Sequence, residues 1–104
     1  MAKYNFMAKN CGAYVSAERD MEFGSDEAAC EFAKQMADKK GTAYKVMRWT
    51  DFSSMEEAAR FQASQNPKTG VYEIYERPDD IYRVMYCVDI KPEKLSRLAN
   101  DYIQ

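Results

Sequence analysis

Three cysteines are the strongest nucleophiles in this sequence, and thiolate chemistry is the first reaction type that they suggest. A reactive thiolate needs a nearby cation, a helix N-terminus or a base that lowers its pKa. Cys30 and Cys87 fall on predicted buried elements and are expected to be small apolar core residues, whereas Cys11 lies in a predicted turn and is expected to react with a thiol reagent. Because the three are odd in number and widely spaced, they favour a reducing, cytoplasmic setting over a disulfide framework or a CxxC site.

Acid–base and metal chemistry have few candidate groups in the chain. Histidine, the side chain used most often for proton transfer near neutral pH, is absent, so a histidine-dependent enzyme is excluded. The adjacent carboxylates Glu56-Glu57 and Asp79-Asp80 suit a helix start and a turn better than a catalytic or cation-binding pair. The 4 glycines are scattered and form no phosphate-binding loop. We therefore expect a non-enzymatic protein with no catalytic residue, no metal and no cofactor.

The composition indicates one folded domain over residues 1–104, because 46% of the residues are hydrophobic and 31% are charged. A net charge of -2 gives the chain no strong attraction to phosphate backbones or anionic membranes. The N-terminal segment lacks the apolar run of a secretory signal, and no apolar run approaches the ~18 residues that a membrane span needs. We expect no membrane partner.

The first half of the chain predicts two strands, a helix and a third strand. Alternating apolar residues indicate a strand over 3–9 and, over 13–23, either one long strand or two short ones. A helix is predicted between the N-cap residue Ser25 and the C-terminal Gly41. Residues 42–49 carry apolar side chains on both faces and are therefore the candidate central strand. The strand–helix–strand passage over residues 13–49 allows one parallel strand pair.

The middle of the chain predicts a second helix and a turn. Overlapping capping-box patterns start at Ser53 and Ser54, and the helix is expected to stop by about Gln65. Residues 66–70 combine a proline and a glycine that are typical of a turn. The residues of this helix expected to face the core are Met55, Ala58, Ala59 and Phe61.

The last part of the chain predicts a β-hairpin over 71–90, with its turn at 77–80. Pro92 then opens a predicted C-terminal helix. The resulting order is β-β-α-β-α-β-β-α. We therefore predict the α+β class, with a single two-layer domain whose mostly antiparallel sheet carries its helices on one face.

A protein-binding surface is the function that the hairpin favours. Tyr72, Tyr75, Tyr82 and Arg83 cluster there, and tyrosine and arginine are side chains that often anchor protein interfaces. The predicted function is a small, soluble, cytoplasmic binding module whose protein partner is unknown. An inhibitor or accessory protein encoded by a phage or mobile element is one example of such a module. Self-association into a homodimer or a larger homo-oligomer would use the same patch, because an open hairpin edge invites pairing with a second copy.

Binding of single-stranded nucleic acid is the alternative. Aromatic side chains on a small sheet can stack on bases when cations lie beside them, and Lys45, Trp49 and Arg83 are the candidate residues. This alternative ranks lower because tyrosines at half-buried strand positions more often belong to the core or its rim.

Overall fold

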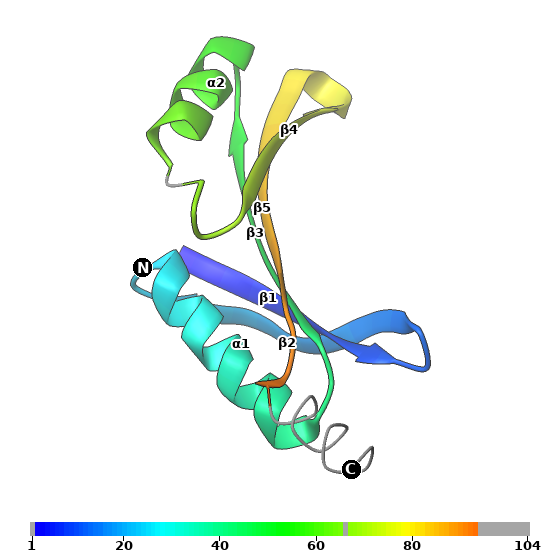
Figure 1. Ribbon diagram of the computed structural model, residues 1–104. Helices are drawn as coiled ribbons and strands as arrows, with labels where there is room; N and C mark the ends of the chain where they lie inside the picture. Colours follow the sequence, from blue (N-terminus) through cyan, green and yellow to red (C-terminus); the bar gives the residue numbers. More distant parts are fainter. Residues whose placement is uncertain (1, 66, 94–104) are drawn as a thin grey trace, which may run out of the picture. The chain divides into compact units, whose positions relative to one another are not determined.

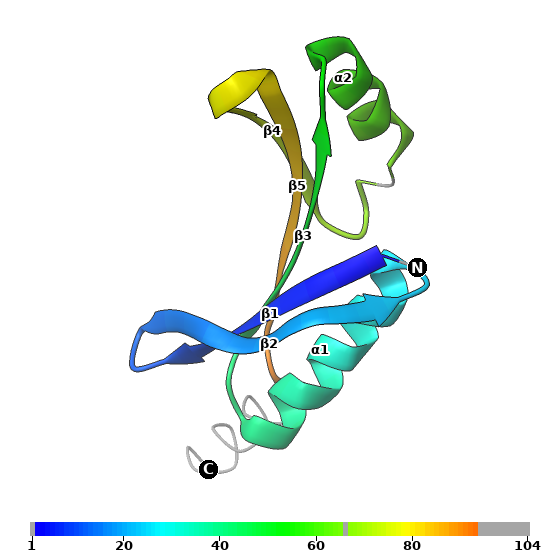
Figure 2. The same cartoon turned by 180° about the vertical axis from the view of Figure 1, so that it is seen from behind.

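The structure is a computed structural model that describes residues 2–65 and 67–93 (Figures 1 and 2). It belongs to the α+β class, with two helices and a five-stranded antiparallel sheet in the order β2-β1-β3-β5-β4. The strand predicted to be central, β3, is central. The predicted parallel pair is wrong, because β1 lies between β2 and β3.

The chain divides into two compact units, Met1–Val46 with Asp89–Gln104, and Met47–Val88, here called unit 1 and unit 2. Strands β3 (Tyr44–Phe52) and β5 (Ile81–Ile90) each contribute residues to both units. Each unit has its own helix and its own core.

Unit 1 begins with an antiparallel hairpin of β1 (Ala2–Asn10) and β2 (Ala13–Phe23). The turn between them holds Cys11 at φ 53° and Gly12 at φ 88°. Glycine adopts this left-handed region without the steric cost of a Cβ atom, which explains why the chain can reverse there.

Helix α1 (Asp26–Lys40) has the predicted ends. The Ser25 side chain accepts a hydrogen bond from the Ala28 N–H, which satisfies one of the unpaired donors of the first turn. At the other end, Gly41 adopts the left-handed conformation with φ 67°, and its N–H donates to the Ala37 carbonyl at 2.7 Å. The helix prediction between Ser25 and Gly41 is confirmed.

The core of unit 1 lies between α1 and one face of the sheet (Figure 1). Aromatic rings fill it, with the Phe6 centroid 5.0 Å from Phe32 and 5.8 Å from Phe23. The Tyr4 hydroxyl donates to the Asp26 carboxylate, which ties β1 to the first turn of α1. The fully buried residues of this core are Tyr4, Phe6, Ala29, Ala33, Ala37, Tyr44 and Val46.

Unit 2 contains the predicted hairpin. Strand β4 (Val71–Arg77) pairs antiparallel with β5, and the short 3₁₀ helix η1 (Pro78–Asp80) joins them. Asp79 has a φ of 66° and Asp80 a φ of 57°, a left-handed conformation that aspartate tolerates better than most residues. The prediction of a hairpin over 71–90 with its turn at 77–80 is confirmed.

Helix α2 (Met55–Ser64) begins at the second of the two predicted capping boxes, since the Ser54 side chain accepts from the Glu57 N–H. The helix ends at Ser64 with Gln65 as its C-cap residue, which agrees with the predicted stop by about Gln65. Ala58 is buried, but Met55 is 50% exposed and Ala59 is also exposed, so the predicted core face was too wide. A helix of three turns on a small sheet buries a narrow stripe, and residues at its first turn and flank stay in solvent.

The predicted C-terminal helix after Pro92 lies outside the described residues. The described order is therefore β1-β2-α1-β3-α2-β4-η1-β5, with two α-helices where the sequence predicted three. Within residues 2–65 and 67–93, no helix combines the length and hydropathy that a membrane crossing requires.

Candidate functional site

The sheet of unit 2 has one face that α2 covers. The Phe61 ring lies 5.2 Å from Phe52, and the Tyr72 ring lies 4.9 Å from Tyr86. Tyr86 is fully buried, and its hydroxyl donates to the Thr69 carbonyl at 2.8 Å. This covered face is the core of unit 2.

A cation sits within this core. The Arg48 guanidinium carbon lies 5.9 Å from the Phe61 and Tyr86 ring centroids and 6.0 Å from that of Tyr72. Arginine next to the face of an aromatic ring gains cation–π attraction, which helps to offset partial burial of its charge. Because rings and α2 surround it, Arg48 is part of the packing and not of an exposed binding surface.

The opposite face of the same sheet carries apolar side chains that remain in solvent. Trp49 is 38% exposed, Tyr75 47%, Val71 57% and Ile81 37%. They belong to three neighbouring strands, β3, β5 and β4. We define the open face by six residues, Trp49, Asp51, Val71, Tyr75, Ile81 and Arg83.

Arg83 holds the centre of the open face together. Its Nε donates to Asp51 Oδ1 at 2.8 Å, and its Nη2 donates to Asp51 Oδ2 at 3.1 Å. The guanidinium carbon also lies 5.3 Å from the Trp49 ring centroid. The two parallel hydrogen bonds orient the guanidinium, and the oriented guanidinium in turn supports the indole ring.

The charges of this pair stabilise one another. The hydrogen bond from Arg83 holds the pKa of Asp51 below its ordinary value of 3.8. The same hydrogen bond raises the pKa of Arg83 above its ordinary value. At neutral pH the open face therefore carries an ion pair in which the carboxylate of Asp51 balances the positive charge of Arg83.

Tyr75 lies directly across from Arg83 in the β4–β5 register. Its hydroxyl donates to Glu73 Oε2 at 2.6 Å, and this hydrogen bond raises the pKa of the Tyr75 phenol. The phenol therefore stays neutral at physiological pH. Tyr75, Arg83 and Trp49 thus lie on the same face of three neighbouring strands, and the guanidinium contacts the Trp49 ring.

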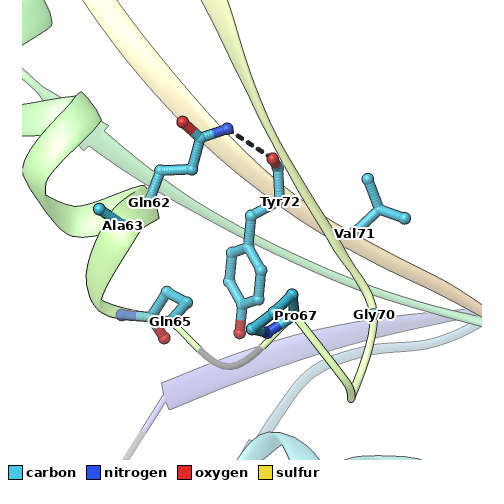
Figure 3. Close-up of a pocket in the computed structure, with 7 residues that line it drawn as sticks. All are labelled: Gln62, Ala63, Gln65, Pro67, Gly70, Val71 and Tyr72. Atoms are coloured by element: carbon cyan, nitrogen blue, oxygen red, sulfur yellow. Dashed lines mark hydrogen bonds between the residues drawn. The ribbon is translucent and has the colours of Figure 1, made fainter.

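A shallow groove lies at the other end of β4 (Figure 3). It has a volume of about 460 Å³, and the Tyr72 ring and Pro67 lie close together along it. Gln62 Nε2 donates to the Tyr72 carbonyl oxygen at 2.7 Å. The lining residues are Gln62, Ala63, Gln65, Pro67, Gly70, Val71 and Tyr72. These lining residues carry no carboxylate, amine, guanidinium or thiol group.

The structure separates the four predicted interface residues into two pairs. Tyr75 and Arg83 lie side by side on the open face. Tyr72 packs against Tyr86 on the covered face, and Tyr82, in register with Glu76, is half-buried on that same side of the strand pair. Residues an odd number of positions apart in a strand point to opposite faces, as Tyr72 and Tyr75 do, so the hairpin cluster in the sequence is not one surface.

The three residues of the nucleic-acid alternative also fall in different units. Trp49 and Arg83 are in contact in unit 2. Lys45 belongs to unit 1, where its Nζ lies 4.6 Å from the Tyr14 ring centroid and 3.8 Å from Asp89 Oδ1.

Three members of the open face, Asp51, Val71 and Ile81, were missed from the sequence. Asp51 follows Trp49 by two residues and therefore shares its face, and Ile81 precedes Arg83 by two residues in the same way. The alternation of side chains along a strand was the sequence signal that could have identified Asp51 and Ile81. It was missed for Asp51 because the predicted strand ended at 49, whereas β3 continues to Phe52.

The groups that could do covalent or metal chemistry are dispersed. Cys11 lies at the β1–β2 turn, Cys30 on α1 and Cys87 on β5, and no disulfide joins described residues. In the described part of the chain, no cluster of three or more cysteine, aspartate or glutamate side chains could hold a metal ion.

The chain was compared with protein-family models, with curated proteins and with solved structures, and none of these matches it. The open face is therefore interpreted from its own chemistry.

Proposed function

We propose that this protein is a small non-enzymatic module that binds another protein through the open face. The observation that carries the proposal is Trp49, which stays 38% exposed while Arg83 and Asp51 hold its surroundings in place. Tryptophan, tyrosine and arginine contribute most of the binding energy in many protein interfaces. A preorganised aromatic ring also loses little side-chain entropy when it binds.

The charge of unit 2 favours a protein partner over nucleic acid. Residues 47–88 contain five basic and seven acidic residues, a net charge of -2. The cation at the centre of the open face, Arg83, is bound to Asp51 through both carboxylate oxygens. Phosphate contacts need accessible cations, so this face suits a partner that buries apolar and aromatic surface.

The same proposal includes a cytoplasmic location and an absence of catalysis. Cysteines that form no disulfide among the described residues suit a reducing compartment. The chain has no histidine to act as a general base. An inhibitor or accessory protein encoded by a phage or mobile element remains our example of such a module.

The test is capture of partners from the native host with matched variants. Trp49→Ala removes the exposed ring from the open face, and Met55→Ala removes a side chain of similar exposure, 50%, from α2. We expect a host protein whose affinity for the wild-type chain falls at least about 10-fold with Trp49→Ala and stays unchanged with Met55→Ala. Affinities of the recovered protein are measured with purified components.

Trp49 is the single tryptophan, so its fluorescence reports directly on the open face. A purified protein partner should change this fluorescence, whereas a single-stranded oligonucleotide should not. Salt-sensitive quenching by the oligonucleotide would instead support the nucleic-acid alternative. If no recovered protein depends on Trp49, the proposed function is wrong.

A further inference from the structure

We infer that unit 2 also pairs with a second copy of this chain along the outer edge of β4. The inference extends the proposed function, because such pairing would bring two open faces together. β4 is the last strand in the order β2-β1-β3-β5-β4, and it is seven residues long. An edge strand of this kind is a template for a further strand.

The backbone of β4 shows which residues point outward. A Cβ atom at Gly70 would lie 3.0 Å from the Cys87 carbonyl oxygen, so this carbonyl points toward β4 beside Val71, its register partner. In an antiparallel pair, alternate residues turn both their N–H and C=O groups to the same side. The odd-numbered residues of β4 therefore bond to β5. The outward residues are Tyr72, Ile74 and Glu76.

At both ends of this row of outward residues, a backbone group cannot bond to a further strand. Gln62 of α2 already donates to the Tyr72 carbonyl (Figure 3). Pro78, which follows the strand, has no N–H to donate. Among residues 2–65 and 67–93, no hydrogen bond beyond the β4–β5 ladder reaches Ile74 or Glu76. In both views of unit 2, the hairpin end at η1 stands apart from α2 (Figures 1 and 2).

Charge complementarity favours the β4 strand of a second copy as the strand that pairs with the outer edge of β4, and it also fixes the register of that pairing. With a two-fold axis at Tyr75, Ile74 of each copy lies opposite Glu76 of the other, and these pairs exchange backbone N–H and C=O bonds. Glu73 of each copy then lies opposite Arg77 of the other. Opposite charges that face one another across strands stabilise the pairing, and here the contact occurs twice.

The neighbouring two-fold registers are disfavoured. An axis at Ile74 would pair Tyr72 with Glu76 and would need the Tyr72 carbonyl that Gln62 occupies. An axis at Glu76 would place the two Glu76 side chains opposite each other, and like charges in this position destabilise a strand pair. The register at Tyr75 uses the free groups and leaves both closed ends undisturbed.

This pairing has a consequence for binding. The two-fold axis stands perpendicular to the sheet, so the open faces of both copies lie on the same side, with the two Tyr75 rings adjacent at the centre. A dimer would therefore present two Trp49 rings to one partner surface. The paired segment is short, so we expect a weak dimer.

The test is a charge swap on the full chain, with association measured by analytical ultracentrifugation over a concentration series. Glu73→Arg places like charges at both flanking contacts, and we expect it to weaken dimerisation at least about 10-fold. The double variant Glu73→Arg with Arg77→Glu restores opposite charges and should restore the wild-type constant. Glu31→Arg makes the same charge change on α1, where the side chain is exposed, and should leave the constant unchanged.

A second measurement does not depend on variants. In NMR spectra of the wild-type chain, raising the concentration should shift the amide signals of Ile74 and Glu76 more than those of Glu73 and Tyr75, whose N–H groups already bond to β5. A chain that stays monomeric up to about 1 mM, or a double variant that fails to regain the wild-type constant, would overturn the pairing. A monomeric chain that still binds its protein partner through Trp49 would leave the proposed function standing.

Discussion

The two units use their aromatic side chains differently. In unit 1, the rings of Tyr4, Phe6, Phe23 and Phe32 lie 5.0–5.8 Å from their neighbours in one cluster beneath α1. In unit 2, the rings of the covered face pack against one another, while Trp49 and Tyr75 on the open face remain 38% and 47% exposed. Burial of an aromatic ring stabilises the fold, while an exposed ring adds contact surface without that benefit. This contrast is why we propose unit 2, and not unit 1, as the unit that binds a partner.

Phe6→Ala tests the structural role of the rings in unit 1. Phe6 is fully buried and contacts two other rings, so its truncation leaves a cavity and should lower the free energy of unfolding by about 3–5 kcal/mol. Urea denaturation followed by circular dichroism measures the loss. Trp49→Ala is the control and should cost less than about 1 kcal/mol. Equal losses would mean that Trp49 is a structural residue and that the contrast between the units is wrong.

Gly70→Ala probes the tightest backbone contact in unit 2. A Cβ atom there would lie 2.5 Å from Tyr86 Cε1 and 3.0 Å from the Cys87 carbonyl oxygen. Because Tyr86 is buried and its hydroxyl is bonded to Thr69, its ring has little room to move. We expect a loss of about 1–3 kcal/mol in the free energy of unfolding, measured by urea denaturation.

The matched control for this substitution is Gly24→Ala, where a Cβ atom would meet no atom within 4 Å. That variant should be neutral or more stable by up to about 1 kcal/mol. Similar losses in both variants would show that the contact with Tyr86 does not decide the outcome.

The smallest expected effect concerns the ion pair of the open face. The folded state lowers the pKa of Asp51 below its ordinary value of 3.8. The ion pair therefore stabilises the fold fully at pH values above 3.8, and this contribution is lost as the pH falls through the lowered pKa. Since both side chains are partly exposed, the contribution should stay below about 1 kcal/mol.

NMR titration of the Asp51 carboxyl measures this shift. Arg83→Gln should return the Asp51 pKa toward 3.8, because the charge and the bidentate geometry are lost. An Asp51 carboxyl that titrates at the same pH in both proteins would show that the ion pair does not persist in solution, and the open face would then lose its organising contact.

Local sequence signals predicted most of the elements. The caps at Ser25 and Ser54, the glycine at 41 and the hairpin turn at 77–80 each act within a few residues, so their effect is visible in the sequence. The end of β3 was missed because Asp51 has weak strand propensity, and the strand continues through it within the sheet. The prediction of a single domain over 1–104 remains a prediction.

The candidate site followed less closely from the sequence. Tyrosine and arginine on the hairpin indicated a binding surface, and Tyr75 and Arg83 do lie together on the open face. Tyr72 faces the core because α2 covers that side of the sheet, and no local pattern says which side a helix will cover.

The amino-acid sequence by itself determined the α+β class, the helix ends, the hairpin and the absence of histidine chemistry, since these depend on residue type and on spacing along the chain. The tertiary structure alone decided that Asp51 binds Arg83, that Trp49 stays exposed and that β4 lies at an edge. Those properties depend on strand order and on helix placement, which bring together residues that are far apart in the chain.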